Sequence, residues 1–322
     1  WEKTHGHDYE NFAEYNVFQM NDTHPTIAVA ELMRILMDEK GLLWDQAWDI
    51  TQKTMAYTNH TLLPEALETW PVRLMERLLP RPMEIIYHIN KIFLHDIAMR
   101  WPGDSEKQAR MSLIDESGDK AVRMAYLAII GSFSVNGVAA LHSKLLCEGL
   151  FRDFYELWPE KFNNKTNGVT PRRWIAHANP TMSALISDHI GDGWVRDLGQ
   201  IDKLKEYASD EHKKFRKKWH KVKQHNKQRL ADLVLENCGV EFDVESMFDV
   251  QVKRIHEYKR QLLNVLHIIH LYNRIKKGDT ENWTPRCVLV GGKAAPGYHM
   301  AKLIIKLVNN VAKVVNEDAG VG

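Results

Sequence analysis

The stretch Asp249-Val-Gln-Val-Lys-Arg-Ile-His-Glu-Tyr-Lys-Arg260 joins an expected strand to an expected helix and carries a dense cluster of positive charge. Its last eight residues contain one acid, Glu257, and five basic side chains: Lys253, Arg254, His256, Lys259 and Arg260. A cluster of this kind suits an anionic ligand. The alternative is a solvated charge run, because such runs usually lie on the surface.

The residues on either side of this stretch predict its local structure. Phe248, Val250 and Val252 alternate as in a short strand, and Arg260 opens a helix that Gly278 ends. The expected apolar face of that helix is Leu262, Val265, Leu266, Ile269, Tyr272 and Ile275. A basic loop between the end of a strand and the start of a helix collects unpaired amides and the positive end of the helix dipole, so we expect a phosphate there.

A second unit of the same kind follows. Cys287 to Val290 predicts a buried strand, Gly291 to Gly297 a glycine-containing loop, and a helix begins at about Tyr298. Two successive strand–loop–helix units indicate an α/β protein with a parallel, doubly wound sheet, whose ligands gather at the carboxyl ends of the strands. The Gly-Gly-Lys sequence matches neither a Walker A loop nor the dinucleotide fingerprint. The residues alone therefore predict a phosphate-handling α/β protein.

Length and composition bound the remaining possibilities. The 322 residues suffice for two domains, and 43 Lys and Arg against 42 Asp and Glu give no bulk charge that points to nucleic acid or to an anionic membrane. No apolar run approaches the ~18 residues of a membrane span. The three cysteines suit free thiols in a reducing compartment, so we expect a cytoplasmic or organelle-lumen location.

The first half of the chain predicts a strand followed by helices. We expect a strand at Val17 to Met20, a helix that ends at Gly41, and a second helix from about Trp44 to Thr58. Prolines at 64, 71, 80 and 82 divide the next region into short helical pieces before a helix from Ile85 to Ile97. Residues 102–120 are expected to be an exposed excursion. Small residues between Gly131 and Gly137 are expected to allow close packing.

Two further segments bear on domain organisation. Asn-Gly and Pro within residues 160–175 mark a crossing segment, where we place a domain boundary. Lys213 to Arg229 holds nine Lys and Arg and no acid, which could indicate nucleic-acid binding. Apolar residues recur there at helical spacing, however, so we expect a solvated amphipathic helix.

Several motifs resemble those of the α-glucan (glycogen or starch) phosphorylases, which are pyridoxal-phosphate enzymes of the two-domain GT-B fold. The resemblance rests on Asn21 to Pro25, Tyr57 to Glu68, Val135 to Ala139, Lys165 to Trp174, Val252 to Arg260, and Gly291 to Lys302. It implies reversible transfer of a terminal α-1,4-linked glucose from glucan to inorganic phosphate, which gives α-glucose 1-phosphate with retained configuration. It also implies a cytoplasmic homodimer (plastidic if the source is a plant), pyridoxal 5'-phosphate acting through its phosphate, and no metal.

The resemblance also assigns roles to individual residues. Arg254 and Lys259 match the clamp on the substrate phosphate, Lys253 a ligand of the cofactor phosphate, and Tyr258 a sugar-hydroxyl contact. His60 and Asn167 match groups that hold the glucosyl unit, although a lone His is usually a core residue and an Asn a turn residue. The other matches are Asp22, His24, Thr61 and Ala66 in the adjacent pocket, Trp174 and Val138 at the cofactor, and Tyr298 at an inhibitor-type site.

The chain also departs from the family pattern. Phe133 stands where many members have His, which we expect to be a tolerated packing change. The chain begins and ends inside the pattern, without the upstream glycine-rich phosphate loop and without the downstream segment that holds the Schiff-base lysine. We therefore expect a central fragment, inactive alone, with residues 1–165 in the N-terminal domain and 166–322 in the C-terminal cofactor-binding domain.

Two alternatives remain open at this point. One is a nucleotide-sugar glycosyltransferase of the same fold, for which a doubled phosphate site has no role. The other is a non-catalytic glucan-binding segment. Glu84 and Tyr87 lie where family members form a storage site for polysaccharide, but that match is loose.

Overall fold

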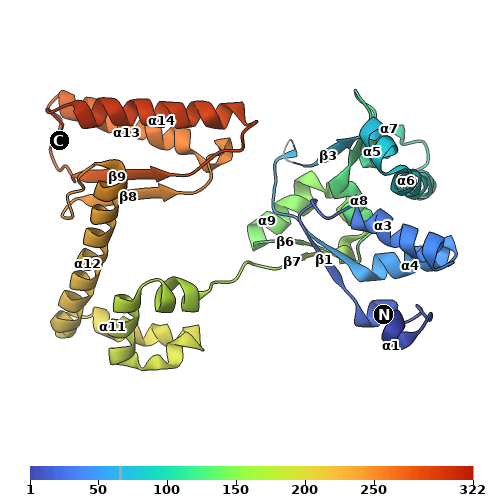
Figure 1. Cartoon of the computed structure of the whole chain (residues 1–322), viewed down its shortest axis with the longest axis horizontal. Helices are drawn as coiled ribbons and strands as arrows, with labels where there is room; N and C mark the ends of the chain where they lie inside the picture. The colour runs from blue at the N-terminus through green and yellow to red at the C-terminus, as the bar shows by residue number, and fades with distance from the viewer. Residues whose placement is uncertain (65–66, 322) are drawn as a thin grey trace. The chain divides into compact units, whose positions relative to one another are not determined.

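The computed structural model describes residues 1–64 and 67–321, and the chain divides into two compact units (Figure 1). The first unit is Trp1–Val169 and the second is Thr170–Gly322. The boundary expected from sequence, after residue 165, lies four residues before this division. The assignment of the units to named enzyme domains stays a prediction.

A four-stranded parallel sheet forms the centre of the first unit. Its strands are β1 (Phe18–Asn21), β2 (Met55–Thr58), β6 (Ser134–Gly137) and β7 (Phe162–Asn164), in the order β1-β2-β6-β7. Tyr57 of β2 pairs with Met20 of β1 and with Val135 of β6, and all three residues are buried. Among these strands β2 is buried at all residues but the last, whereas β1 and β7 lie at the two ends of the sheet and are more exposed.

The helices of the first unit pack with this sheet into one apolar core. Val29, Met33, Ile86 and Leu127 are fully buried members of that core. The helices are α1 (Glu2–His5), α2 (Phe12–Tyr15), α3 (Ala28–Arg34), η1 (Ile35–Glu39), α4 (Trp44–Thr54), α5 (Val72–Leu78), α6 (Pro80–Arg100), α7 (Ser105–Met111), α8 (Met124–Ile130), α9 (Ala140–Leu145), η3 (Leu146–Leu150), α10 (Arg152–Leu157) and η4 (Pro159–Lys161).

Two sequence-based element boundaries were wrong in this unit. The helix expected from Trp44 to Thr58 ends at Thr54, and the next four residues form β2. The sequence has no turn residue where the helix ends and the strand begins, at Thr54 and Met55. The buried strand could therefore not be distinguished from a continuation of the helix. Pro82 does not divide a helix, because it lies in the first turn of the 21-residue α6, whereas Pro80 marks the division between α5 and α6.

The segment 102–120 is more ordered and more buried than its polar sequence predicted. It contains α7 and β4 (Ile114–Asp115), and β4 pairs with β5 (Ala121–Arg123) in an antiparallel sheet that also includes β3 (Thr69–Pro71). Buried Leu113 donates its amide to Asn90 Oδ1 over 2.8 Å. The close packing expected around Gly131 is confirmed, because a Cβ there would lie 2.5 Å from Val29 Cγ1.

The second unit begins with a small helical cluster. Met182, Leu185, Trp194 and Phe215 form its core. Its helices are η5 (Arg172–His177), α11 (Pro180–Ile190), η6 (Asp192–Val195), η7 (Leu198–Ala208), η8 (Asp210–His212) and α12 (Lys213–Cys238). Phe215 is buried on α12 whereas most of the basic residues of that helix are exposed, so the solvated amphipathic helix expected from sequence is confirmed.

The rest of the second unit is a parallel strand pair with two helices. β8 (Met247–Val252) and β9 (Arg286–Gly291) pair in parallel, η9 (Glu257–Lys259) lies in the basic loop, and α13 (Gln261–Lys276) and α14 (His299–Glu317) pack on each other (Figure 1). The expected parallel α/β arrangement is confirmed. Gly278, with φ of 73°, donates its amide to Ile275 at the end of α13, as predicted.

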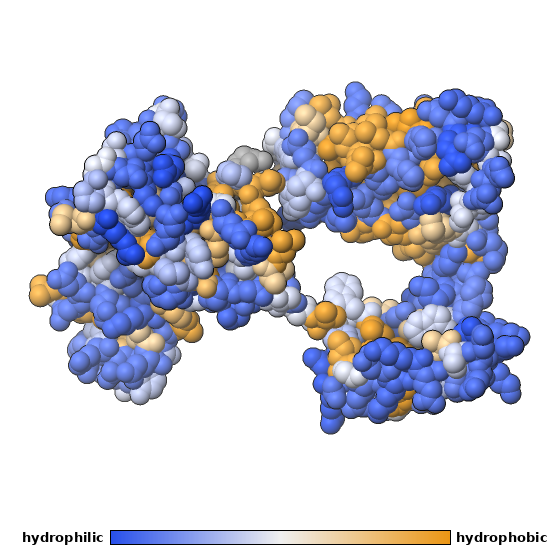
Figure 2. All heavy atoms as spheres, turned by 180° about the vertical axis from the view of Figure 1, so that it is seen from behind, coloured by the Kyte–Doolittle hydropathy of each residue, from blue (hydrophilic) through white to orange (hydrophobic). Residues whose placement is uncertain are grey.

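The apolar face predicted for α13 is only partly buried. Val265 is 1% exposed, whereas Leu262 and Leu266 are exposed, as are Val250 and Val252 of β8. Figure 2 shows apolar surface over this part of the second unit. The elements packed against α13 cover only one stripe of its surface. The wide apolar face in the sequence therefore predicted that more residues would be buried than the structure buries.

Candidate functional site

Sequence-predicted site residues of the first unit follow the ends of its parallel strands. Asp22 comes directly after β1, His60 two residues after β2, Val138 directly after β6, and Asn167 three residues after β7. The carboxyl ends of parallel strands meet at one edge of a sheet, and that edge is where ligands bind in open α/β folds. The fold therefore brings residues from four distant sequence motifs to one edge.

His60 is exposed and hydrogen-bonds to Asn21 Oδ1 through Nε2, at 2.5 Å. The alternative of a core histidine is therefore wrong. Its position depends on buried Asn59, whose side chain donates to the Tyr57 hydroxyl and accepts the Thr61 amide. Burial raises the pKa of Tyr57, so the hydroxyl that accepts this bond stays neutral.

The loop after β1 supplies the next two predicted residues. Asp22 has φ of 69°, in the left-handed region, and its Oδ1 accepts the Thr23 amide at 2.7 Å. Thr23 donates its hydroxyl to Glu68, so the turn after β1 is hydrogen-bonded to the residue that precedes Thr69. His24 is exposed, and Ala66, predicted for the same pocket, lies outside the described residues.

Asn167 is held beside Val138 by the main chain. The Asn167 amide donates to the Val138 carbonyl over 3.1 Å, and the Asn167 side chain is exposed. Val138 in turn donates its amide to Nδ1 of His142, which sequence reasoning missed. The neutral His142 ring therefore carries its proton on Nε2, and that atom is buried without a hydrogen-bond partner among the described residues.

The basic loop follows β8 in the second unit, at the corresponding carboxyl edge. Lys253 and Arg254 are exposed, Ile255 between Arg254 and His256 is buried, Tyr258 is 57% exposed and Lys259 is half-buried. The ion pairs of this unit engage other cations: Lys205, Arg216, Arg274, Lys276 and Arg286. Within the described residues, the cations of the loop are thus left for an anionic ligand.

The expectation of unpaired loop amides was wrong for several positions. The amides of Lys253 and Ile255 donate to Gly291 and Lys293 of the glycine-containing loop, and the amide of His256 donates to Gln261 Oε1. Sequence showed the charges but not the contacts between the two loops. An anion at this edge would meet side-chain cations more than loop amides.

Tyr298 lies against the same loop. Its hydroxyl donates to Glu257 Oε2 at 2.6 Å and accepts the Glu257 amide at 3.2 Å, and its ring meets His256 edge to face. The Glu257 carboxylate raises the pKa of Tyr298. Trp174, the other aromatic predicted for the site, belongs to a different element, η5, and is 69% exposed.

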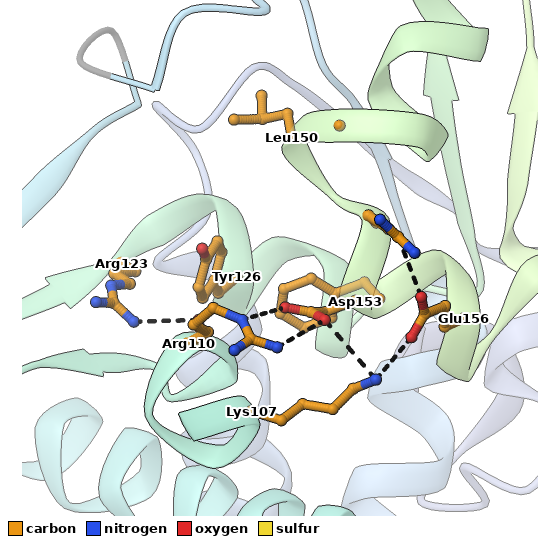
Figure 3. A pocket seen from close by; sticks show the side chains of 10 residues that line it. Lys107, Arg110, Arg123, Tyr126, Leu150, Asp153 and Glu156 are labelled. Carbon is orange, nitrogen blue, oxygen red and sulfur yellow. Dashed lines mark hydrogen bonds and ion pairs between the residues drawn. The ribbon is translucent and has the colours of Figure 1, made fainter. Parts of the chain in front are cut away.

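A cavity of about 700 Å³ in the first unit is lined by none of the described site residues that were predicted for that unit (Figure 3). Its lining is Lys107, Arg110, Arg123, Tyr126, Gly149, Leu150, Arg152, Asp153, Phe154 and Glu156. Arg110 pairs with Asp153, and Lys107 and Arg152 pair with Glu156. These three cations are engaged by the two carboxylates, and the pairs link α7 to α10, so the cavity is a weaker candidate than the sheet edges.

Two negative observations concern the described residues only. No cluster of His, Cys, Asp or Glu among them is arranged to hold a metal ion. In the same residues, every helix is too short or too polar to cross a membrane.

The fold and the two edges define a class: α/β proteins with polar and cationic groups at the carboxyl ends of parallel strands. Within this class, the chain belongs to the carbohydrate phosphorylase family, whose model matches residues 1–322. It is 57% identical over 313 residues to the glycogen phosphorylase of Synechocystis sp.. The matched residues make up 97% of this chain and 37% of that protein. It is 54% identical over 315 residues to the muscle form from Mus musculus and 54% over 314 residues to the brain form from Rattus norvegicus, each covering 98% of this chain and 37% of the relative. The chain thus spans about 37% of the length of these relatives.

Proposed function

We propose that this chain is the central part of an α-glucan phosphorylase of the GT-B fold, in which the first unit holds the sugar and the second holds phosphate. The observation that carries the proposal is the convergence of the family-like residues on the carboxyl edges of parallel strands in both units. The family match over residues 1–322 supports it. In the complete enzyme, the reaction transfers a terminal glucose from glucan to inorganic phosphate and yields glucose 1-phosphate.

Each edge offers groups suited to its part of this reaction. His60 and Asn167 present an imidazole and an amide, which can donate to and accept from sugar hydroxyls. Arg254 offers a planar fork for two phosphate oxygens, and Lys259 offers a point charge. Tyr258, exposed beside them, offers a hydroxyl to the sugar. These residues bind and orient the substrates and oppose the repulsion between two nearby phosphates.

The residues present fit pyridoxal 5'-phosphate. The exposed Lys253 ammonium at the end of β8 suits a phosphate dianion, and the exposed Trp174 indole offers an apolar face to an aromatic ring. In the first unit, Val138 lies at the carboxyl edge of the sheet, and its amide donates to His142 Nδ1. When bound, the cofactor supplies a phosphate that exchanges a proton with the substrate phosphate.

Substitution of Arg254 in the full-length enzyme tests the phosphate assignment. In the complete enzyme, Arg254→Ala should lower kcat/KM by the equivalent of about 3–5 kcal/mol, because the substrate phosphate loses its charged partner. Arg254→Lys should also be impaired, since the fork geometry is lost. Arg229→Ala, which removes an exposed arginine of α12 outside the loop, is the control and should leave kcat/KM near its wild-type value. Equal kcat/KM for wild type and Arg254→Ala would refute the assignment.

These 322 residues, tested by themselves, should neither retain the cofactor covalently nor release glucose 1-phosphate. They correspond to 37% of the length of their relatives, and none of their lysines matches the Schiff-base motif. The measurements are cofactor absorbance after borohydride reduction and phosphorolysis of maltoheptaose. A positive result in either measurement would contradict the proposed division of the enzyme.

A further inference from the structure

Gln261 is a buried glutamine at the first position of α13, directly after the basic loop. The residue is 1% exposed. Its Nε2 donates to the Arg254 carbonyl over 3.1 Å, and its Oε1 accepts the His256 amide over 3.3 Å. A buried amide needs partners for both its donor and its acceptor, and Gln261 finds them in the main chain on both sides of Ile255.

Other contacts hold the loop in the same path. Ile255 is 4% exposed and packs in a core cluster with Ala301 and Ile304. At the far end of the loop, Gln251 Nε2 donates to the Lys259 carbonyl over 3.2 Å, and Asn264 donates to Gln251 over 2.9 Å. The main chain is therefore fixed between the exposed Arg254 and the half-buried Lys259.

The neutrality of the glutamine matters in a loop with this much positive charge. A carboxylate at position 261 could accept the His256 amide, but it could not donate to the Arg254 carbonyl. It would also place a negative charge beneath the cations and reduce their attraction for an anion. An uncharged amide fixes the main chain and adds no negative charge beneath the cations.

We propose that Gln261 is a positioning residue that sets the main chain of Arg254 and thereby aims its guanidinium at inorganic phosphate. This inference rests on the proposed function and names a residue on which phosphate affinity depends. Gln261 acts through Arg254 and does not touch the substrate.

Kinetics of the full-length enzyme test the inference. Gln261→Ala and the nearly isosteric Gln261→Glu should each raise KM for inorganic phosphate at least about tenfold, because Ala loses both hydrogen bonds to the loop main chain and Glu loses the one to the Arg254 carbonyl. KM for glucan should stay near its wild-type value. Gln228→Ala removes an exposed glutamine on α12 that bonds Asp232, and it should leave both constants unchanged.

A double-mutant cycle separates positioning from a general loss of structure. If Gln261 acts through Arg254, Gln261→Ala should change KM for phosphate little in an Arg254→Ala background. The same fold-change in both backgrounds would overturn the inference. So would a parallel rise in KM for glucan and phosphate in Gln261→Glu.

Direct titration with inorganic phosphate distinguishes this inference from the proposed function. If the full-length protein bound phosphate but did not carry out phosphorolysis, the proposed function would fail, and a weaker Kd in Gln261→Ala would still support positioning. An unchanged Kd in Gln261→Ala, or no phosphate binding by the wild type, would overturn the inference.

Discussion

Lys161 is a charged residue held partly out of water, in the first unit. Its Nζ lies 3.9 Å from the centroid of the Trp158 ring and 3.4 Å from the Ile129 carbonyl oxygen. Desolvation lowers the pKa of Lys161 from 10.5 to about 8. Below pH 8 the Lys161 ammonium is therefore charged in the folded protein, although it is solvated less well there than in the unfolded chain. This lowers the free energy of unfolding, and the effect disappears as the pH rises toward 10.5.

Replacement of Lys161 by Met should stabilise the first unit at pH 7 by about 1–3 kcal/mol, because the desolvation cost exceeds the lost cation–π contact. The advantage over wild type should shrink between pH 8 and 10.5, where the folded wild type loses the proton and the unfolded chain still holds it. Urea unfolding of both proteins at pH 7, 9 and 10.5 measures this. A difference that does not change with pH would show that the amine is well solvated.

At the residue scale, sequence indicated the charged and motif-bearing residues better than the residues that hold them. Arg254 and Lys253 stand out in the sequence because five basic side chains fall within eight residues. Gln261 and His142 are not, because a polar residue in a helix is typical of a solvated surface. Their roles depend on main-chain atoms brought near by the fold, and no local pattern reports those contacts.

The contact between the two loops of the second unit depends on Gly292. A Cβ at this position would overlap the Lys253 carbonyl oxygen, whereas a Cβ on Gly297 would meet nothing within 4 Å. The main chain of the glycine-containing loop therefore packs directly against the main chain of the basic loop. Sequence reasoning had identified both loops, and the fold adds that each one positions the other.

Replacement of Gly292 by Ala should push the two loops apart and lower the free energy of unfolding by about 1–3 kcal/mol, as overpacking does. Gly297→Ala, in the same loop with open space around it, should be neutral or slightly stabilising. Urea denaturation compares the two variants with wild type. Equal stability of Gly292→Ala and Gly297→Ala would show that the loop backbone yields without cost.

At the element scale, long amphipathic helices and short strands next to turn residues were predicted well. β8, β9, α12 and α14 all lie close to their expected positions. β2 was missed because all its residues but the last are buried, so that it lacks the alternation of a half-buried strand. The strand order β1-β2-β6-β7 could not be predicted from the sequence either, because β6, which pairs with β2, comes after a long insertion.

For the whole molecule, turn signals in the sequence predicted two units, and the resemblance to known motifs predicted their family. The Asn-Gly and Pro within residues 160–175 predicted a boundary. The reaction followed only from matching motifs, because a parallel α/β fold supports many functions. The unit-by-unit placement of the candidate residues makes each sheet edge separately testable.

The long insertion between β2 and β6 has a consequence for how the first unit folds. β2 ends at Thr58 and β6 begins at Ser134, yet the two strands pair directly. The chain must close that long loop before this pairing becomes favourable, whereas α6 and the β3-β5-β4 sheet lie inside the insertion and use nearer contacts. In pulsed hydrogen exchange during refolding, the amides of α6 should gain protection before those of β2 and β6. Simultaneous protection would mean that the parallel sheet and its insertion form in one step.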